Sequence, residues 1–393
     1  MLSSRDRILT THVGSLPRNE ALSDLLIDRE EGQPLDERQL AQEMDRAVRH
    51  ILEKQAEAGI DIANDGEQQR VGFQTYVPRR MSGFAGESKR RRGIDFEEFP
   101  ELVADLMRRF PKRSRMQNAP EAQAEVHYLD IAPITQELER LKRNANEVGR
   151  FAECFMTAPS PGIISSTMLN AFYDSQKAYL AALAREMRYE YLAIHHAGLL
   201  LQIDAPDLAM DGAMFYRDLS DAQFVKAAEL HIAALNDAIE GIPRDRVRLH
   251  VCWGNWNGPH THDVPLELIL PVLHQANVGA LSIEFGNPRH QHELEAVRRH
   301  PLPAHMLLLP GVIESNSNIV EHPEVVARRL EEAVAAVGDR ERVIASCDCG
   351  FGTFTNREYV LEPVVWLKLK SLRQGADIAS ARLWGRSAGL GGN

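Results

Sequence analysis

The feature that most constrains the fold is a repeated alternation of short apolar runs with longer amphipathic segments. In the longer segments apolar residues recur at three- and four-residue spacing, as on a helix packed against a sheet. This alternation predicts parallel strands joined by crossover helices. We expect strands at 9–16, 60–65, 150–157, 199–204, 247–252, 280–285, 305–310 and 343–346, and helices at 36–58, 174–197, 221–239, 323–337 and 363–374.

Eight strands in this order favour an α/β fold in which residues 1–393 form a single closed (β/α)8 (TIM) barrel. An open doubly wound sheet is the alternative. No G-x-G-x-x-G follows the first strand, which argues against dinucleotide binding. Residues 83–129 interrupt the alternation after the second strand. We expect them to form a helical insertion on the active-site face, acting as a lid or an oligomer contact.

Composition excludes several classes of function. The net charge of −11 argues against nucleic-acid binding, which needs clustered Lys and Arg. The one basic run, 89–92, predicts a short solvated turn. No apolar stretch approaches the roughly 20 residues of a membrane span, and the first residues lack an apolar signal segment. Four cysteines in 393 residues indicate free thiols and a cytoplasmic location, not a disulfide framework.

Reactive side chains gather where the expected strands end, which is where barrel enzymes carry their chemistry. No single one of these residues is decisive, but their shared position at strand ends predicts one common site. The candidates are Ser15, Asp65, Glu67, Asp204, His250, Cys252, Glu284 and Cys349.

The pattern His250-Val251-Cys252 has the chemistry of a metal site. Side chains two apart on a strand share a face, so one nitrogen and one sulfur would point into the same space. Cys347 and Cys349 offer two more sulfurs on a common face, and Glu284 is a carboxylate expected to be buried and to need a partner. His, Cys, Cys and Glu form a tetrahedral zinc set. A buried structural pair is the alternative for His250 and Cys252.

Other chemical residues have simpler interpretations. The loop 253–262 holds two tryptophans and predicts an ordered mouth of the site. His260 and His262 are expected to be loop residues and not ligands. Cys154 lies in an apolar strand and is expected to belong to the core.

Several ordered segments together resemble one family. The chain is similar to the zinc-dependent, cobalamin-independent methionine synthases (methionine synthase II), over nearly its whole length and within their catalytic barrel. The segments that carry the resemblance are Thr11-His12-Val13-Gly14-Ser15-Leu16-Pro17-Arg18, Asp65-Gly66-Glu67, Gln202-Ile203-Asp204-Ala205-Pro206, His250-Val251-Cys252, Ile283-Glu284, Pro310-Gly311-Val312 and Asp348-Cys349-Gly350.

The resemblance implies a catalytic Zn²⁺ held by His250, Cys252, Glu284 and Cys349. The Asp-Cys-Gly match selects Cys349 over Cys347. A free thiol has a pKa near 8.5, whereas the reacting species is the thiolate, which zinc favours by ligation. Glu284 is the hardest of these ligands and the one expected to yield its place to the substrate.

The resemblance also implies the substrates. Ser15, Glu67 and Asp204 match family positions that hold homocysteine, and we expect Asp204 and Glu284 to take part in catalysis. The partners would be a small-molecule thiol and a methyl or alkyl donor. The sequence leaves open whether the protein forms a homo-oligomer.

Two differences from the family pattern concern the site of the methyl donor. A family tryptophan associated with the folate pterin aligns with Ser165, and a family histidine aligns near Asn316. Both changes weaken the case for methyltetrahydrofolate and leave the donor open.

Two other functions compete with methionine-synthase-like methylation. The epoxyalkane:coenzyme M transferases share this scaffold and open an epoxide with a zinc-bound thiolate. Their sulfonate thiol would need cations in the pocket, which Arg18 and Arg70 could supply. A zinc-storage or regulatory barrel without catalysis is the other alternative. The related uroporphyrinogen decarboxylase barrels do not need the His-Cys-Glu-Cys set.

Overall fold

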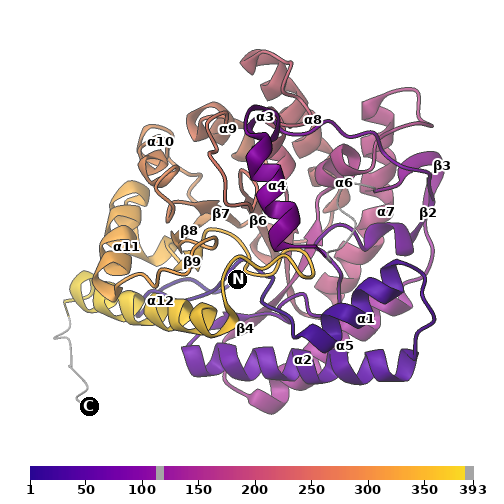
Figure 1. The fold of residues 1–393 in the computed structure, drawn as a ribbon. Coiled ribbons are helices and arrows are strands. Elements are labelled where there is room, and N and C mark those ends of the chain that lie inside the picture. Colours follow the sequence, from indigo (N-terminus) through magenta and orange to yellow (C-terminus); the bar gives the residue numbers. More distant parts are fainter. Residues whose placement is uncertain (112–118, 386–393) are drawn as a thin grey trace.

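A curled parallel sheet forms the centre of the computed structural model, which describes residues 1–111 and 119–385 (Figure 1). Seven strands pair in the order β1-β4-β5-β6-β7-β8-β9, each parallel to its neighbours. The strands are β1 (Ile62–Ala63), β4 (Glu153–Pro159), β5 (Leu200–Asp204), β6 (Val247–Val251), β7 (Ala280–Glu284), β8 (Leu307–Ile313) and β9 (Ser346–Cys347).

The first expected strand, 9–16, is not a regular strand. Thr10 pairs with Ala345, and Thr11 pairs with Ile62, through single parallel bridges. The segment thus lies between the two edges of the sheet. One bridge joins it to β1, and the other joins it to Ala345, the residue directly before β9. The chain turns at Gly14, whose φ is 147°, so the pairing does not extend. The described residues therefore form seven regular parallel strands and not the eight that the sequence predicts.

Helices cover the outside of the sheet, and all five that the sequence predicts are present. The last helix is longer than expected and reaches Leu383. None of the described helices is long and apolar enough to cross a membrane. The covering helices are α1 (Glu20–Glu30), α2 (Glu37–Ala58), α5 (Ala132–Val148), α6 (Pro161–Thr167), α7 (Gln176–His196), α8 (Asp221–Ala238), α9 (Leu266–Leu273), α10 (Leu294–Arg299), α11 (Pro323–Val337) and α12 (Glu362–Leu383).

Helix α2 shows how the sequence sets these boundaries. The side chain of Asp36 accepts hydrogen bonds from the backbone N–H groups of Arg38 and Gln39 and caps the helix start. Gly59 ends it in a left-handed conformation with φ of 82°, which glycine adopts without a steric penalty. The buried stripe includes Val48 and Leu52. The next strand, β1, can therefore start within a few residues and lead directly to the site.

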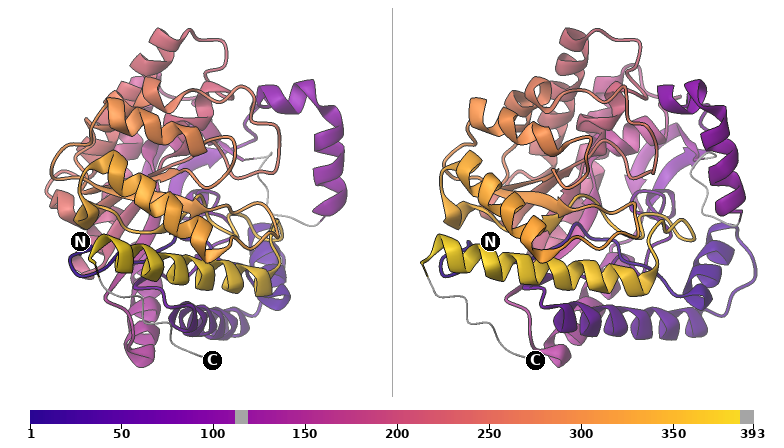
Figure 2. Two further views of the ribbon diagram at one scale, coloured as in Figure 1. Left: turned by 90° about the vertical axis from the view of Figure 1, so that its left-hand side faces the viewer. Right: turned by 60° about the vertical axis from the view of Figure 1, so that its left-hand side comes forward.

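The insertion is not purely helical, contrary to the sequence-based prediction. Strands β2 (Met81–Ala85) and β3 (Glu121–Tyr128) form an antiparallel pair, and helices α3 (Ile94–Glu98) and α4 (Pro100–Arg109) lie between them in sequence. In β3, Ala122 and Val126 lie four residues apart on one face and are buried, as on a strand that packs one face against the core. Figure 2 shows α3 and α4, in purple, standing out from the helices around the sheet.

Candidate metal and substrate site

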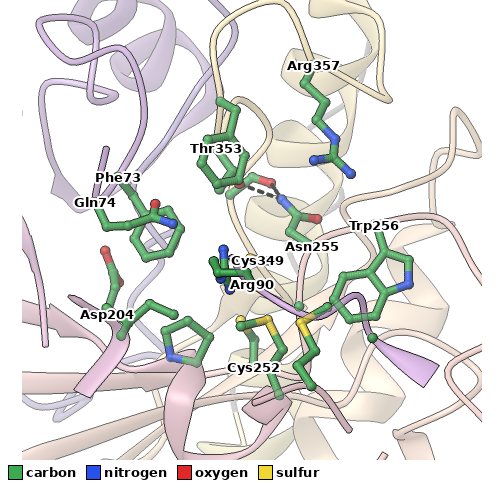
Figure 3. Close-up of a pocket in the computed structure, with 18 of the residues that line it drawn as sticks. Phe73, Gln74, Arg90, Asp204, Cys252, Asn255, Trp256, Cys349, Thr353 and Arg357 are labelled. Atoms are coloured by element: carbon green, nitrogen blue, oxygen red, sulfur yellow. Dashed lines mark hydrogen bonds between the residues drawn. The ribbon is translucent and has the colours of Figure 1, made fainter. Parts of the chain in front are cut away.

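One cavity of about 450 Å³ collects six of the eight predicted reactive residues, and Asp65 and Glu284 are not among its lining residues. Its floor is built where strands of the sheet end: Asp204 is the last residue of β5, and Cys252 directly follows β6. Figure 3 shows Asp204, Cys252 and Cys349 around this floor. The predicted residues that line the cavity are Ser15, Glu67, Asp204, His250, Cys252 and Cys349.

Three side chains at the floor meet as possible metal ligands. One ligand atom each from His250, Cys252 and Cys349 lies within 4.8 Å of the others, and all three residues are buried. The Cys349 Sγ is 3.7 Å from the His250 Nε2. His250 and Cys252 share a face because they are two residues apart, and β9 ends two residues before Cys349. The sheet therefore brings together groups that are far apart in sequence.

The electrostatics of the trio favour ionisation of one thiol. A hydrogen bond with Cys349, together with the nearby His250, lowers the pKa of Cys252 well below its usual range. Burial lowers the pKa of His250, but Cys252 and Asp204 together more than offset this, so the net shift of the pKa is upward. The same hydrogen bond raises the pKa of Cys349. Cys252 is the thiol that loses its proton first, which is the form that ligates a metal.

Glu284, the fourth expected ligand, is buried at the end of β7 but is not among the atoms that meet within 4.8 Å. Its carboxylate accepts hydrogen bonds from the Trp253 N–H at 3.0 Å and from the Asn287 side-chain amide at 2.8 Å. Burial raises its pKa well above the usual range, and the nearby Cys252 acts in the same direction. Glu284 thus lies beside the trio and is held by the loops after β6 and β7.

The expected substrate residues line the same cavity. Burial raises the pKa of the Asp204 carboxyl to about 8, and Glu67 adds to this effect. Glu67 has a left-handed φ of 55°, which is uncommon for a residue with a side chain. Its Oε2 is buried without a hydrogen-bond partner in the described structure. Ser15 lies against Gly350, where a Cβ would collide with its hydroxyl. A small cationic group would satisfy the two carboxylates.

Four other residues singled out from the sequence lie outside this cavity. Cys347 is fully buried in β9, and Cys154 packs against the core. Arg18 donates to the backbone carbonyls of Gly352 and Glu67, so its guanidinium is used structurally. Arg70 is buried and paired with Glu137 at 3.0 Å. Neither arginine lines the cavity, so neither supplies the cation that a sulfonate would need there.

The loop after β6 is ordered by two stacked pairs, as the sequence indicates. Trp253 stacks on His290 with ring centroids 3.9 Å apart, and Trp256 stacks on His260 at 4.3 Å. Both histidines hydrogen-bond to Asp263, at 2.9 Å from His260 and 3.0 Å from His290. These three residues also lie close enough to hold a metal ion. Both histidines already hydrogen-bond to one oxygen, Oδ2, of the Asp263 carboxylate, so we assign the three residues to loop structure.

The insertion contributes one wall of the cavity, through residues that the sequence analysis did not single out as site residues. The basic run 89–92 lines the cavity, so it is not merely a solvated turn. Helix α4 adds Val103, Leu106, Met107 and Phe110 to the same wall. The sequence feature that could have predicted this wall is the basic run 89–92, because it precedes a helix with apolar residues on one side. Residues near the C-terminus that also line the cavity and were not predicted are Thr353, Phe354 and Arg357.

Comparison with known proteins shows the family of this chain. The family model described as the catalytic domain of cobalamin-independent synthases matches residues 8–365. A methionine synthase of Sulfurisphaera tokodaii is 23% identical, covering 95% of this chain and 93% of the relative. The 2-hydroxypropyl-CoM lyase of Xanthobacter autotrophicus is 23% identical, covering 88% and 87%.

A solved structure shows the same fold. It is a B12-independent methionine synthase of a Shewanella species in complex with selenomethionine, with a TM-score of 0.70 at 22% identity, covering 96% of this chain and 99% of that one. The match of the family model over most of the length decides the classification. This chain belongs to the cobalamin-independent synthase family and carries its catalytic domain.

Proposed function

We propose that this protein catalyses zinc-dependent methyl or alkyl transfer to a small-molecule thiol, with homocysteine as the thiol. The observation that carries the proposal is that possible metal ligands and buried carboxylates line the same cavity. A nitrogen and two sulfurs meet at its floor, and two buried carboxylates, Glu67 and Asp204, lie on the same cavity. The first set suits a soft metal and a thiol, and the second suits an ammonium group.

The donor set at the floor fits zinc. Thiolate and imidazole are zinc's usual structural and catalytic ligands, and catalytic sites keep one position for substrate. We assign His250, Cys252 and Cys349 as ligands, with Glu284 as the fourth that a thiol substrate would replace. A zinc ion bound there would favour the thiolate form of the substrate. The lowered pKa of Cys252 supports this assignment because ligation needs a thiolate.

The chain's own residues would position the amino acid. Glu67 and Asp204 would bind its ammonium group, with Ser15 hydrogen-bonded to the same substrate. In the transfer, a sulfur–carbon bond forms while the bond from that carbon to the donor breaks, and the donor fragment leaves with the electron pair. We assign catalytic roles to Glu284, which would be the ligand that the substrate replaces, and to Asp204, which would orient the thiol by holding the ammonium group of the same substrate.

The domain architecture is part of the proposal. The segment 9–11 bridges both edges of the seven-stranded sheet, which supports a single complete (β/α)8 barrel with that segment in the eighth position. The insertion supplies one wall of the cavity through residues of α3 and α4. We assign it as a lid over the site.

A second candidate is epoxide opening by a sulfonate thiol. It is favoured by the similarity to 2-hydroxypropyl-CoM lyase and by the basic run in the cavity wall. Against it, Arg18 and Arg70 point elsewhere, and acidic groups surround the floor.

The deciding experiment loads the purified protein with zinc and offers homocysteine or 2-mercaptoethanesulfonate with methylcobalamin or 1,2-epoxypropane. Mass spectrometry of the thiol products gives the readout. Methylated homocysteine supports the proposal, and 2-hydroxypropylated 2-mercaptoethanesulfonate supports the second candidate. If zinc-loaded protein alkylates neither thiol above the rate of metal-free protein, both are rejected.

A further inference from the structure

A second hollow lies on the outer surface, in a groove between α2 and α5, which pack side by side (Figure 1). Its volume is about 390 Å³, and it shares no lining residue with the cavity that holds the candidate metal site. Positions 38, 41, 42, 45 and 46 of α2 line it because they fall on one side of a helix. The lining residues are Arg38, Ala41, Gln42, Asp45, Arg46, Arg140 and Arg143.

The groove is cationic, although the net charge of the protein is −11. Its lining holds four guanidinium groups and one carboxylate, that of Asp45, which leaves an excess of three positive charges. Asp45 is already engaged, because it accepts hydrogen bonds from Arg143 and, at 3.2 Å, from the Asn144 side-chain amide. The lining therefore lacks the anionic groups that its arginines could bind.

Two of these arginines have donors without a partner. In residues 1–111 and 119–385, the Arg38 side chain forms no hydrogen bond or ion pair. The Nε of Arg140 is buried without a hydrogen-bond partner and lies 3.8 Å from the Asp45 carboxylate. Burial lowers the pKa of Arg140, so an added anion would stabilise its charged form.

The other two arginines are held only by ion pairs at the surface. Arg143 pairs with Asp45, and Arg46 pairs with Glu43 at 2.6 Å. Both arginine side chains are more than half exposed, and ion pairs of this kind contribute little to stability. A multiply charged anion can therefore bind these guanidinium groups without breaking a buried contact.

Arg140 is held in place from the inside of the protein. Its Nη1 donates a hydrogen bond to the side-chain carbonyl of Gln69. The Gln69 amide donates in turn to Asp65 at 2.8 Å, and both Gln69 and Asp65 are buried. A guanidinium that is fixed in this way loses less conformational freedom on binding an anion than a free surface arginine does.

The spacing of the cations favours an elongated anion of limited length. Arg38 and Arg46 are eight residues apart on α2, so the groove extends roughly 12 Å along the helix. A single phosphate would reach only part of this set, whereas a linear di- or triphosphate could contact several guanidinium groups, each in a two-pronged geometry. A long nucleic-acid backbone would continue beyond the groove onto an acidic protein, which would repel it.

We propose that this groove binds a small ligand with a linear di- or triphosphate group, held by Arg38, Arg140 and Arg143. A nucleotide and an inorganic polyphosphate would present the same chemistry to these residues. The site does not rest on the proposed function, because it shares no residue with the metal and substrate cavity.

The test is calorimetric titration of the zinc-loaded, full-length protein with inorganic triphosphate, adenosine triphosphate and inorganic phosphate, in magnesium-free buffer. Because polyphosphates chelate zinc, the titrations are repeated on metal-free protein and should give the same affinities. We expect one triphosphate site per chain, with binding roughly 10-fold tighter than that of inorganic phosphate and weakened by added salt. Tighter binding of the nucleotide than of inorganic triphosphate would identify a nucleotide as the ligand, and the reverse order would identify the inorganic anion.

Two substitutions locate the site. Arg140→Gln should weaken triphosphate binding roughly 10-fold and Arg38→Gln roughly 3-fold, because a half-buried guanidinium contributes more than an exposed one. Arg38 is exposed and forms no hydrogen bond or ion pair within the described residues, so Arg38→Gln keeps the test decisive if Arg140→Gln fails to fold.

The matched control is Arg49→Gln, which removes the same charge from α2 outside the groove, where Arg49 pairs with Glu147. Lys89→Gln removes a cation from the wall of the other cavity. Both variants should keep the parent affinity for triphosphate. Equal affinity of the parent protein for triphosphate and phosphate, or no binding of either, overturns the proposal. Equal losses in Arg38→Gln and Arg49→Gln, or a loss confined to Lys89→Gln, also overturn it, because binding would then come from the general field or from the other cavity.

Discussion

Asp95, on the inserted helix α3, accepts a hydrogen bond from the backbone N–H of His260 at 2.8 Å. The same carboxylate accepts a hydrogen bond from the Thr261 hydroxyl at 3.0 Å. His260 has a left-handed φ of 54°, and its amide faces the carboxylate across 165 positions of sequence. Asp95 therefore fastens the insertion to the loop that follows Cys252.

Removing this contact should loosen the insertion without unfolding the barrel. In Asp95→Ala, two hydrogen bonds to a charged group are lost, each worth about 1.5–3 kcal/mol. We expect amide hydrogen exchange in 94–98 to become at least 10-fold faster while exchange in β5 and β6 stays unchanged. The control is Glu98→Ala, which breaks an exposed pair with His262 that should contribute little. Equal effects of the two changes would contradict this role of Asp95.

The buried carboxyl of Asp211 should make stability depend on pH. Its pKa is about 7 in the folded protein, against 3.8 as the ordinary value. Below pH 3.8 it is protonated in both states. Between pH 3.8 and 7 the folded state keeps a proton that the unfolded state releases. This contribution to the free energy of unfolding therefore falls as the pH rises towards 7 and is lost above it.

The variant Asp211→Asn should flatten this dependence. We expect its free energy of unfolding, relative to the parent protein, to be higher at pH 8 than at pH 5 by about 2–4 kcal/mol. Urea unfolding at the two pH values gives the measurement. Asp218→Asn is the control, because Asp218 is 71% exposed. A parallel shift of both variants at both pH values would refute the assignment.

Glu67 provides the test of thiol recognition. If it binds an ammonium group, Glu67→Gln should weaken homocysteine binding by roughly 1.5–3 kcal/mol. Zinc content should not change, because Glu67 is not among the atoms that meet at the floor. Calorimetry with homocysteine and with 2-mercaptoethanesulfonate makes the comparison. Equal affinity of the parent protein for both thiols would contradict an amino-acid substrate.

The candidate site was largely readable from sequence because it lies at strand ends. Asp204 is the last residue of β5 and His250 the next-to-last residue of β6, and parallel pairing sets them directly side by side. Strand position alone leaves Cys347 and Cys349 both open as the partner of Cys252. The choice of Cys349 came from the family resemblance. The spacing of apolar residues and the order of elements along the chain are properties of the sequence itself, so one sequence suffices to predict them.

The insertion could not be predicted in the same way. Its position depends on contacts such as Asp95 with His260, between segments whose separation carries no periodic signal. The place of the basic run 89–92 in the cavity wall was hidden for the same reason. The strand predicted at 9–16 is not formed as a regular strand. Within this segment only Thr10 and Thr11 pair with neighbouring residues of the sheet. Local patterns give elements, whereas the docking of a long insertion is decided by tertiary contacts.

Metal content should depend on two cysteines and not on the others. We expect about one zinc per chain, which is largely lost in Cys252→Ser and in Cys349→Ser. Cys154→Ser and Cys347→Ser should keep the metal, because neither thiol lies in the group that meets within 4.8 Å. Elemental analysis after dialysis gives the result. Zinc loss in Cys347→Ser with retention in Cys349→Ser would show that the wrong cysteine was assigned.

The donor is tested last, and we expect methyltetrahydrofolate to be a poor substrate. Ser165 stands where the family tryptophan is expected, is fully buried and does not line the cavity. Its hydroxyl donates to the Gly162 carbonyl at 2.8 Å, so it offers no stacking surface. Stacking on an aromatic ring is worth about 1–3 kcal/mol. Asn316, near the expected histidine, carries no titratable group to protonate a leaving group.

General-acid assistance is worth about 100- to 10,000-fold in rate, and a folate leaving group needs it. A methylcorrinoid or a short epoxide needs less, so we expect both to outpace the folate with zinc-loaded protein and homocysteine. Trp256 offers an aromatic face in the same cavity, and Trp256→Leu tests whether it replaces the missing ring. The folate could react as fast as the other donors in the parent protein and lose its activity in this variant. In that case Trp256 would bind the pterin ring in place of the missing tryptophan. Ser165 and Asn316 would then not indicate which donor the protein uses.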